Sequence, residues 1–384
     1  MKSYNISFIS FFILLQCWMS SAVCADIVPL AERFNISSKI LKEDRSYLVW
    51  KPNDYDPGKA YPVLYLLDGL DHLNYVAGAV DYFQSNNRIP PMLVVAIENT
   101  DRNRDIGFKS FEPGSSGAEN FLAFLENELI PEINSSYSTQ KYRLLVGHSA
   151  GGMFTLYALL NDPTLFNAYI SVSGPLFWHE EYLVKAAETK AKELKDLPID
   201  VFISLGDEDT DTIGAGLKLA AVLEMSVDWQ EKYKERPLRW TYRHYPSEDH
   251  MSTIMPSVNE GLRTIFADWY MERPFELYEI GGFSGIEKHY KNVSRRMGYT
   301  VTPPYDTLRQ ITRILDQRER FVEAQNTMTK AIEFYPENQY AHYLLADIYT
   351  KQKLNDKAIE YFQLSLKLDP NFEAAKNRLQ ALKP

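Results

Sequence analysis

Short apolar runs alternate with amphipathic segments along the first two-thirds of the chain. Near-continuous apolar runs over residues 61–67 and 92–98 are typical of parallel strands buried on both faces. Residues 120–133 instead carry apolar side chains three and four positions apart, which predicts a helix. Further strands are predicted within 34–52 and at 142–146, 168–173, 201–205 and 239–245, and further helices at 150–160, 182–195, 213–234 and 255–270. This alternation predicts an α/β fold with a mostly parallel sheet flanked by helices.

The pattern changes after residue 271. Residues 272–304 contain two adjacent glycines and a Pro-Pro pair, and this composition predicts a linker. Beyond the linker, Ala324 and Ala358 lie 34 positions apart, the period of the tetratricopeptide repeat. We therefore expect an α/β domain over 26–271 and a small all-α domain of two repeats and a closing helix over 305–384. Two repeats are fewer than such arrays usually need, so we expect them to lean on the first domain.

The N-terminus has the layout of a secretory signal peptide. Lys2 supplies a positive start, residues 6–15 form an apolar run, and small residues lead up to Ala25. The run is too short to span a bilayer comfortably, which favours cleavage after Ala25 over a membrane anchor. We expect residues 1–25 to be removed and the protein to be exported, to the periplasm or the medium. Both cysteines lie in this segment, so the mature chain is expected to have no disulfide and no thiol nucleophile.

Charge narrows the range of partners. The formal net charge is −10 and no block of Lys and Arg is present, which argues against nucleic acid and anionic lipid surfaces. No stretch after the signal peptide is long enough to span a membrane. No cluster of His, Asp and Glu has metal-ligand spacing, so neither a metal nor an organic cofactor is expected. The repeats either bind a partner peptide or only brace the first domain.

The candidate nucleophile is Ser149, in the sequence Gly-His-Ser-Ala-Gly-Gly over 147–152. An apolar strand precedes this segment and a helix follows it. A sharp turn between the two would lift the serine hydroxyl clear of the sheet, and the flanking glycines remove side chains that would clash in the bend. The start of the helix favours the negative charge that develops during attack on a carbonyl. The alternative is a glycine-rich turn with an inert serine.

A serine nucleophile needs a base, which in this arrangement follows an acid in the chain. Four histidines lie between Ser149 and the repeats. His179 precedes any suitable acid, His289 lies beyond the last helix of the domain, and His244 is expected to point into a packed face of its strand. His250 lies in a loop after the strand at 239–245, where the carboxyl edge of the sheet is expected. It is therefore the predicted base, and the alternative is a solvated loop histidine.

The acid is expected just after the strand at 201–205. Asp207, Glu208 and Asp209 all follow it, and chemistry alone does not choose among them. Any one of them could instead belong to a solvated loop or cap a helix.

Two backbone N–H groups are expected to stabilise the oxyanion. One is that of Ala150, the residue after the nucleophile. The other is expected from the loop after the strand at 61–67, at Gly69 or Leu70, because a glycine lets the backbone approach closely. The alternative for Gly69 is an ordinary glycine between a strand and a loop.

Three segments together resemble a known family. Residues 61–69 (YPVLYLLDG), 96–105 (AIENTDRNRD) and 147–152 (GHSAGG) resemble the putative-esterase (esterase D-like) family of α/β hydrolases. That family includes siderophore, feruloyl and acetyl esterases and mycolyltransferases. The resemblance covers about residues 35–270 and implies an α/β-hydrolase fold, with Ser149 as nucleophile and His250 as base. Family members often carry Gly-x-x-Asp or Gly-x-x-Glu after the acid strand, which implies Asp209 as the acid, with Glu208 and Asp207 as alternates.

Three further side chains are candidates for substrate binding. Arg102 and Arg104 follow the strand at 92–98, at the edge of the sheet where ligands bind in α/β folds. They either contact an anionic substrate, support the rim of the active site, or form salt bridges with Asp101 and Asp105, and the salt bridges are favoured. Trp178 either lines the substrate pocket or packs in the core.

The sequence thus predicts an exported serine esterase that hydrolyses a small-molecule or glycan ester through an acyl-enzyme on Ser149. Siderophore, acetyl and feruloyl esters are the candidate substrates. An acyltransferase with the same triad is the alternative within enzymes. A binding scaffold that acts through its repeats is the alternative outside them.

Overall fold

The computed structural model describes residues 30–107, 117–226 and 237–382. From Ala31 onward, the described residues form one compact unit. The predicted signal peptide lies outside the described residues. Residues 227–234, the end of the helix predicted at 213–234, also lie outside the described residues. The described helix in this region spans Thr210–Ser226.

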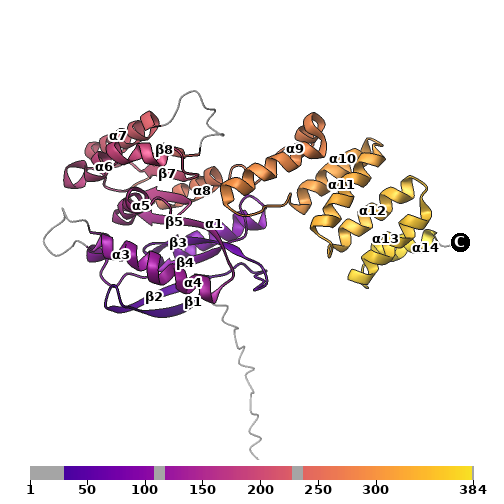
Figure 1. Ribbon diagram of the computed structural model, residues 1–384, viewed down its shortest axis with the longest axis horizontal. Helices are drawn as coiled ribbons and strands as arrows, with labels where there is room; N and C mark the ends of the chain where they lie inside the picture. The colour runs from indigo at the N-terminus through magenta and orange to yellow at the C-terminus, as the bar shows by residue number, and fades with distance from the viewer. Residues whose placement is uncertain (1–29, 108–116, 227–236, 383–384) are drawn as a thin grey trace, which may run out of the picture. The chain divides into compact units, whose positions relative to one another are not determined.

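The described residues contain one sheet of eight strands in the order β1-β2-β4-β3-β5-β6-β7-β8 (Figure 1). The first two strands pair antiparallel, and β2 also pairs antiparallel with β4. The other six strands, β3 to β8, all run parallel to one another, which confirms the mostly parallel sheet. The strands are β1 (Glu32–Ser38), β2 (Glu43–Trp50), β3 (Tyr61–Leu66), β4 (Leu93–Ile97), β5 (Thr139–His148), β6 (Ala168–Val172), β7 (Asp200–Leu205) and β8 (Arg239–His244). The residues of β3, β4, β6 and β7 are all buried, as their apolar runs predict.

Helices cover both faces of the sheet. The core on one face includes residues of α1 (Gly69–Ser85) and α8 (Ile254–Ile265). The core on the other face includes residues of α3 (Ala118–Phe124), η1 (Leu125–Leu129), α4 (Ile130–Ser136), α5 (Ala150–Asn161), α6 (Trp178–Leu194) and α7 (Thr210–Ser226). A short helix, α2 (Arg102–Ile106), follows β4. The helix predicted at 120–133 is thus α3, η1 and α4 in succession.

The segment predicted as a linker is in fact mostly helical. Helix α9 spans Pro274–Met297 and is interrupted at Gly282, which has φ 60°. Ile286, Tyr290 and Val293 are buried and recur at helical spacing. The glycines suggested an irregular chain, but one interruption at a positive φ accommodates them, and helix continues on both sides of it.

Five helices follow α9 in the described part of the chain. They are α10 (Tyr305–Gln317), α11 (Phe321–Phe334), α12 (Gln339–Lys351), α13 (Asn355–Leu368) and α14 (Glu373–Leu382). Ala324 and Ala358, the positions that revealed the repeat, are fully buried in α11 and α13. A small residue at this position lets the two helices of each repeat pack closely. The predicted closing helix is α14.

Candidate active site

Ser149 lies in a tight turn between β5 and α5. Its φ of 59° and ψ of −126° are unusual for a residue with a side chain, and strain of this kind gathers at functional sites. The Ser149 amide donates to the Val172 carbonyl at 2.8 Å, which anchors the turn to the neighbouring strand. A Cβ atom on Gly147 would lie 2.2 Å from the Gly151 carbonyl oxygen, so this turn needs glycine there. The sequence therefore folds into the sharp turn that was predicted to present the serine hydroxyl.

His250 bridges Ser149 and Glu208. Its Nε2 atom lies 2.9 Å from the Ser149 hydroxyl oxygen, and its Nδ1 atom lies 2.9 Å from Oε1 of Glu208. Since a carboxylate only accepts, Nδ1 carries the proton and Nε2 is left free to accept the serine proton. The three side chains follow the ends of β5, β7 and β8. This is the arrangement of nucleophile, base and acid that a serine hydrolase uses.

The favoured acid, Asp209, occupies a different position from the one expected. Its carboxylate accepts from the backbone amides of Asp211 and Thr212 at 3.0 and 2.9 Å and from the Thr212 hydroxyl at 2.9 Å. These bonds cap the start of α7, and they lower the pKa of Asp209 below its ordinary value. Asp207 is exposed. The contact with His250 is made by the alternate candidate, Glu208, whose side chain is 11% exposed.

Two contacts fix the loop that carries His250. The Asp249 carboxylate accepts from the amides of Met251 and Ser252 at 2.9 and 2.7 Å, which closes a turn around His250. In addition, Nε2 of His148 lies 2.7 Å from the His250 carbonyl oxygen and must therefore donate to it. Burial lowers the pKa of His148 to about 4, so its ring is neutral near pH 7.

Sequence reasoning missed His148 as a functional residue. Its neighbour Ser149 carries the motif, and no local motif singles out residue 148 itself. The signal that could have found it is the position itself, since the last residue of a central strand at the carboxyl edge of the sheet faces the loops there.

The expected oxyanion donors lie at the first turns of two helices that cover opposite faces of the sheet but follow neighbouring strands. Ala150 begins α5, and Gly69 and Leu70 begin α1. Amides in the first turn of a helix have no partner within that helix. The strands that lead into the two helices, β3 and β5, are paired, with Leu66 opposite Val146. A Cβ atom on Gly69 would lie 2.7 Å from the Ala96 carbonyl carbon, so glycine is required there.

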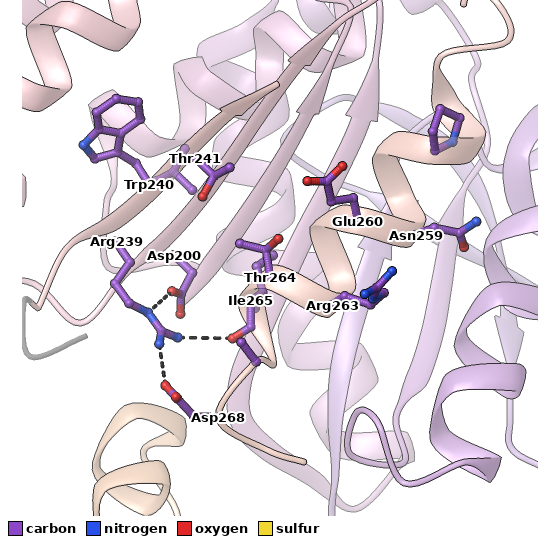
Figure 2. Close-up of a pocket in the computed structure, with 13 residues that line it drawn as sticks. Asp200, Arg239, Trp240, Thr241, Asn259, Glu260, Arg263, Thr264, Ile265 and Asp268 are labelled. Carbon is purple, nitrogen blue, oxygen red and sulfur yellow. Dashed lines mark hydrogen bonds and ion pairs between the residues drawn. The ribbon is translucent and has the colours of Figure 1, made fainter. Parts of the chain in front are cut away.

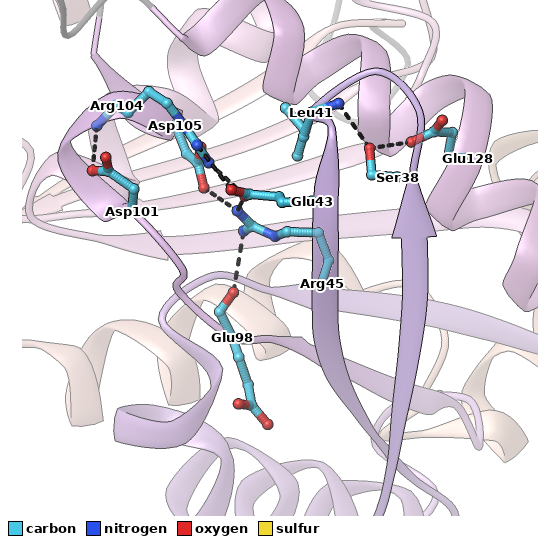
Figure 3. Close-up of polar contacts among 9 residues, drawn as sticks. All are labelled: Ser38, Leu41, Glu43, Arg45, Glu98, Asp101, Arg104, Asp105 and Glu128. Atoms are coloured by element: carbon cyan, nitrogen blue, oxygen red, sulfur yellow. Dashed lines mark hydrogen bonds and ion pairs between the residues drawn. The ribbon is translucent and has the colours of Figure 1, made fainter.

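The two candidate arginines have separate roles. Arg104 pairs with Glu43, with Nη1 and Nη2 at 2.9 and 2.6 Å from the two carboxylate oxygens, and with Asp105 at 2.6 Å (Figure 3). The hydrogen bonds from Arg104 lower the pKa of Glu43 to about 2. In the same network, Arg45 is 1% exposed and pairs with Asp105. Arg104 thus matches the salt-bridge alternative.

Arg102 lies closer to the nucleophile. Its guanidinium pairs with Asp68, the residue before Gly69, and its Nη2 atom lies 3.3 Å from the His148 carbonyl oxygen. Trp178 begins α6, is 37% exposed, and packs edge-to-face against the neighbouring rings of Phe177 and His179.

A cavity of about 780 Å³ lies elsewhere on the sheet (Figure 2). Asp200 and Arg239, which begin β7 and β8, line it, whereas Glu208 and His250 follow the opposite ends of these strands. It is therefore separate from the triad.

Two further expectations concern the outer part of the sheet and metal sites. His244 was expected to face the core, but it is exposed, because β8 is the edge strand.

Within residues 30–107, 117–226 and 237–382, no three His, Cys, Asp or Glu side chains gather as a metal-ion site. No helix in these ranges is long and apolar enough to cross a membrane.

The known proteins that this chain resembles are esterases and related hydrolases. Residues 38–265 match the Putative esterase family, and residues 340–372 match the tetratricopeptide repeat. The ferri-bacillibactin esterase BesA of Bacillus subtilis is 26% identical over 269 residues, covering 62% of this chain and 89% of that protein. A siderophore triacetylfusarinine C esterase of Aspergillus fumigatus is 30% identical over 177 residues, covering 41% of this chain and 60% of that protein. The crystal structure of an IroE-like serine hydrolase from Shewanella oneidensis has a TM-score of 0.66 at 26% identity, covering 79% of this chain and 99% of that one.

The family match covers more than half of the chain, and it includes the turn around Ser149 and the loop around His250. The likeness to the Shewanella hydrolase confirms the predicted α/β-hydrolase architecture. Both curated relatives are named as ester hydrolases. The chain therefore belongs to the Putative esterase family of α/β hydrolases, with a tetratricopeptide repeat in its C-terminal helical region.

Proposed function

We propose that this protein is an exported serine esterase that hydrolyses carboxylic esters through an acyl-enzyme on Ser149. The observation that carries the proposal is the position of His250, with one ring nitrogen 2.9 Å from the Ser149 hydroxyl and the other 2.9 Å from Glu208. Membership of an esterase family makes an ester the natural substrate.

The acylation step begins with attack of the Ser149 hydroxyl oxygen on the ester carbonyl, while His250 Nε2 takes its proton. Glu208 holds Nδ1–H and stabilises the imidazolium that forms. The amides of Ala150 and of Gly69 or Leu70 then hold the oxyanion of the tetrahedral intermediate. His250 returns the proton to the departing alcohol, which leaves an acyl group on Ser149. Water, activated by His250, releases the acid in a second round of the same steps.

A siderophore ester is the substrate that we propose. The two curated relatives are named as a ferri-bacillibactin esterase and a triacetylfusarinine C esterase. Their names concern iron-chelating esters, and we extend this substrate class to the present chain. Acetyl and feruloyl esters are the competing substrates.

Labelling with a fluorophosphonate probe tests the mechanism. The wild-type protein should label, Ser149→Ala should not, and Ser247→Ala, which alters an exposed serine in the loop before His250, should label like the wild type. If the folded wild-type protein is not labelled, the proposed serine mechanism is wrong.

A hydrolysis panel tests the substrate. It should compare iron-loaded catecholate and hydroxamate siderophore esters with feruloyl, acetyl-glycan and short to medium acyl esters, each against Ser149→Ala. We expect the highest kcat/KM for a siderophore ester. A higher kcat/KM for a feruloyl or acetyl ester would contradict the siderophore substrate but would still agree with the serine mechanism.

Export is tested separately, by fractionation and N-terminal sequencing of the protein expressed with its full N-terminus. We expect the mature chain to begin at Asp26 and to be found outside the cytoplasm. A cytoplasmic protein that retains Met1 would contradict export.

A further inference from the structure

The turn between β3 and α1 is held by a buried carboxylate. Asp68 is 5% exposed and adopts a left-handed backbone conformation, with φ 52° and ψ 47°. Its Oδ1 atom accepts from the Asn99 side-chain amide at 2.7 Å. A non-glycine residue in this conformation carries strain that its surroundings must offset. The next residues, Gly69 and Leu70, are the expected oxyanion donors of this turn.

Arg102 supplies the main counterpart of this carboxylate. Its Nε atom lies 2.6 Å from Oδ1 of Asp68, and its Nη2 atom lies 2.9 Å from Oδ2. Burial opposes ionisation of Asp68, but the hydrogen bonds and charge of Arg102 outweigh it and lower the pKa of Asp68 below its ordinary value. The pair is therefore a bidentate salt bridge between charged partners.

The same guanidinium reaches the turn of the nucleophile. Nη2 of Arg102 lies 3.3 Å from the carbonyl oxygen of His148, the residue before Ser149. The same carboxylate also lies against the helix of the nucleophile turn, because a Cβ atom built on Gly151 would lie 3.0 Å from Oδ2 of Asp68. The salt bridge thus lies between the turn that carries Gly69 and the turn that carries Ala150.

We propose that Arg102 is a positioning residue that fixes the separation of the two oxyanion donors. The proposal rests on the proposed function, because it concerns the same oxyanion. Arg102 acts through Asp68 on one turn and through the His148 carbonyl on the other. It does not donate to the oxyanion itself.

Geometry makes this role specific to arginine. An oxyanion hole works only when both donors lie within hydrogen-bond distance of one oxygen, and displacement by about 1 Å can cost on the order of 100-fold in rate. Three contacts to two turns need the planar fork of a guanidinium, and a lysine ammonium cannot reproduce that fork. Loss of Arg102 would also leave the charge of Asp68 without its partner next to the nucleophile.

The competing role is direct binding of an anionic substrate, because 34% of the Arg102 side chain is exposed. The two roles differ in their kinetic effect. A positioning residue affects the transition state and lowers kcat for every ester. A substrate-binding arginine raises KM, and it does so for anionic esters only.

The test compares Arg102→Lys, Arg102→Gln and Arg102→Ala with the wild type on a neutral and an anionic ester that share one leaving group. Arg309→Gln is the matched control, because it removes a part-exposed arginine that pairs with Asp306 in α10. We expect kcat to fall 10- to 100-fold for both esters in each Arg102 variant, with KM changed less than threefold. Guanidinium ion added to Arg102→Ala should restore part of the lost kcat, and Arg309→Gln should match the wild type.

Three outcomes would overturn the proposal: unchanged kcat, an increase in KM confined to the anionic ester, or a loss of rate equal to the loss of folded protein measured by circular dichroism. The double variant of Asp68→Asn with Arg102→Gln adds a second measure, and its kcat should be close to that of the slower single variant. If the two single variants act independently, the fold-loss of kcat in the double variant equals the product of their two fold-losses. That result would contradict a shared role of Asp68 and Arg102. If the wild type neither labels nor hydrolyses any ester, the proposed function fails, and this outcome differs from each of the others.

Discussion

Nε2 of His148 lies 2.7 Å from the carbonyl oxygen of His250, so the residue before the proposed nucleophile holds the loop of the proposed base. The contact joins the end of β5 to the loop after β8, across two intervening strands. It therefore couples two turns that are far apart in the sequence.

Replacement of His148 should lower activity by displacing His250. We expect His148→Ala to reduce kcat roughly 10- to 100-fold, because the loop loses its hydrogen-bond donor. His148→Gln, which can still donate from its amide, should lose less. His342→Gln is the matched control, because His342 is also buried and its Nε2 atom lies 2.8 Å from a main-chain oxygen, that of Pro336 in the repeats. Steady-state kinetics with circular dichroism check the result, and equal rates for all three variants would contradict it.

The buried ring of His148 should also make stability depend on pH. Burial lowers its pKa from 6.5 to about 4 in the folded state. Between these values the unfolded chain binds a proton that the folded chain does not, so stability should fall as the pH falls from 6.5 towards 4. Urea unfolding at several pH values should show a steeper decline for the wild type than for His148→Gln, by about 3 kcal/mol over the full range at most. Parallel declines would show that His148 titrates normally.

Exchange of the acids distinguishes Glu208 from Asp209. Glu208→Gln should lower kcat by a factor of 10² to 10⁴, because the amide no longer stabilises the proton on Nδ1 or the charged imidazolium, roughly as in other triads. Asp209→Asn should leave kcat nearly unchanged and lower the free energy of unfolding by at most about 1 kcal/mol, because asparagine still caps α7. A larger loss of kcat in Asp209→Asn than in Glu208→Gln would reverse the assignment.

A buried ion pair joins α9 to the sheet. Arg296 donates to both carboxylate oxygens of Asp200 at 2.8 and 3.0 Å, and Arg239 donates to one of them at 2.6 Å. Arg296→Met should lower the free energy of unfolding by roughly 2–4 kcal/mol, because a charge buried at the start of β7 loses a partner. Arg295→Met, which alters the exposed neighbouring arginine, should change it by less than about 0.5 kcal/mol. Equal effects in urea unfolding would contradict a specific role for Arg296.

Local patterns predicted much of the site. Ser149 and His250, which the structure brings together, could be predicted because their proposed roles depend on position after a strand, and apolar runs reveal strands well. The choice among Asp207, Glu208 and Asp209 depends on which carboxylate α7 uses as a cap, and that depends on the backbone of one turn. The role of Arg102 depends on the pairing of β3 with β5, which brings Asp68 next to the nucleophile turn. Such long-range contacts leave no local pattern in the sequence.

Strand β7 carries Asp200 at its first residue and leads to Glu208 just past its last. Six residues of extended chain span about 20 Å. The salt bridges of Asp200 and the proposed acid, Glu208, therefore lie at opposite ends of a stiff strand. Random mutagenesis followed by selection for heat resistance could therefore alter the Asp200 end with little effect on turnover. Selection for new substrates would act on the Glu208 end, and gains of the two kinds should combine nearly additively in one variant.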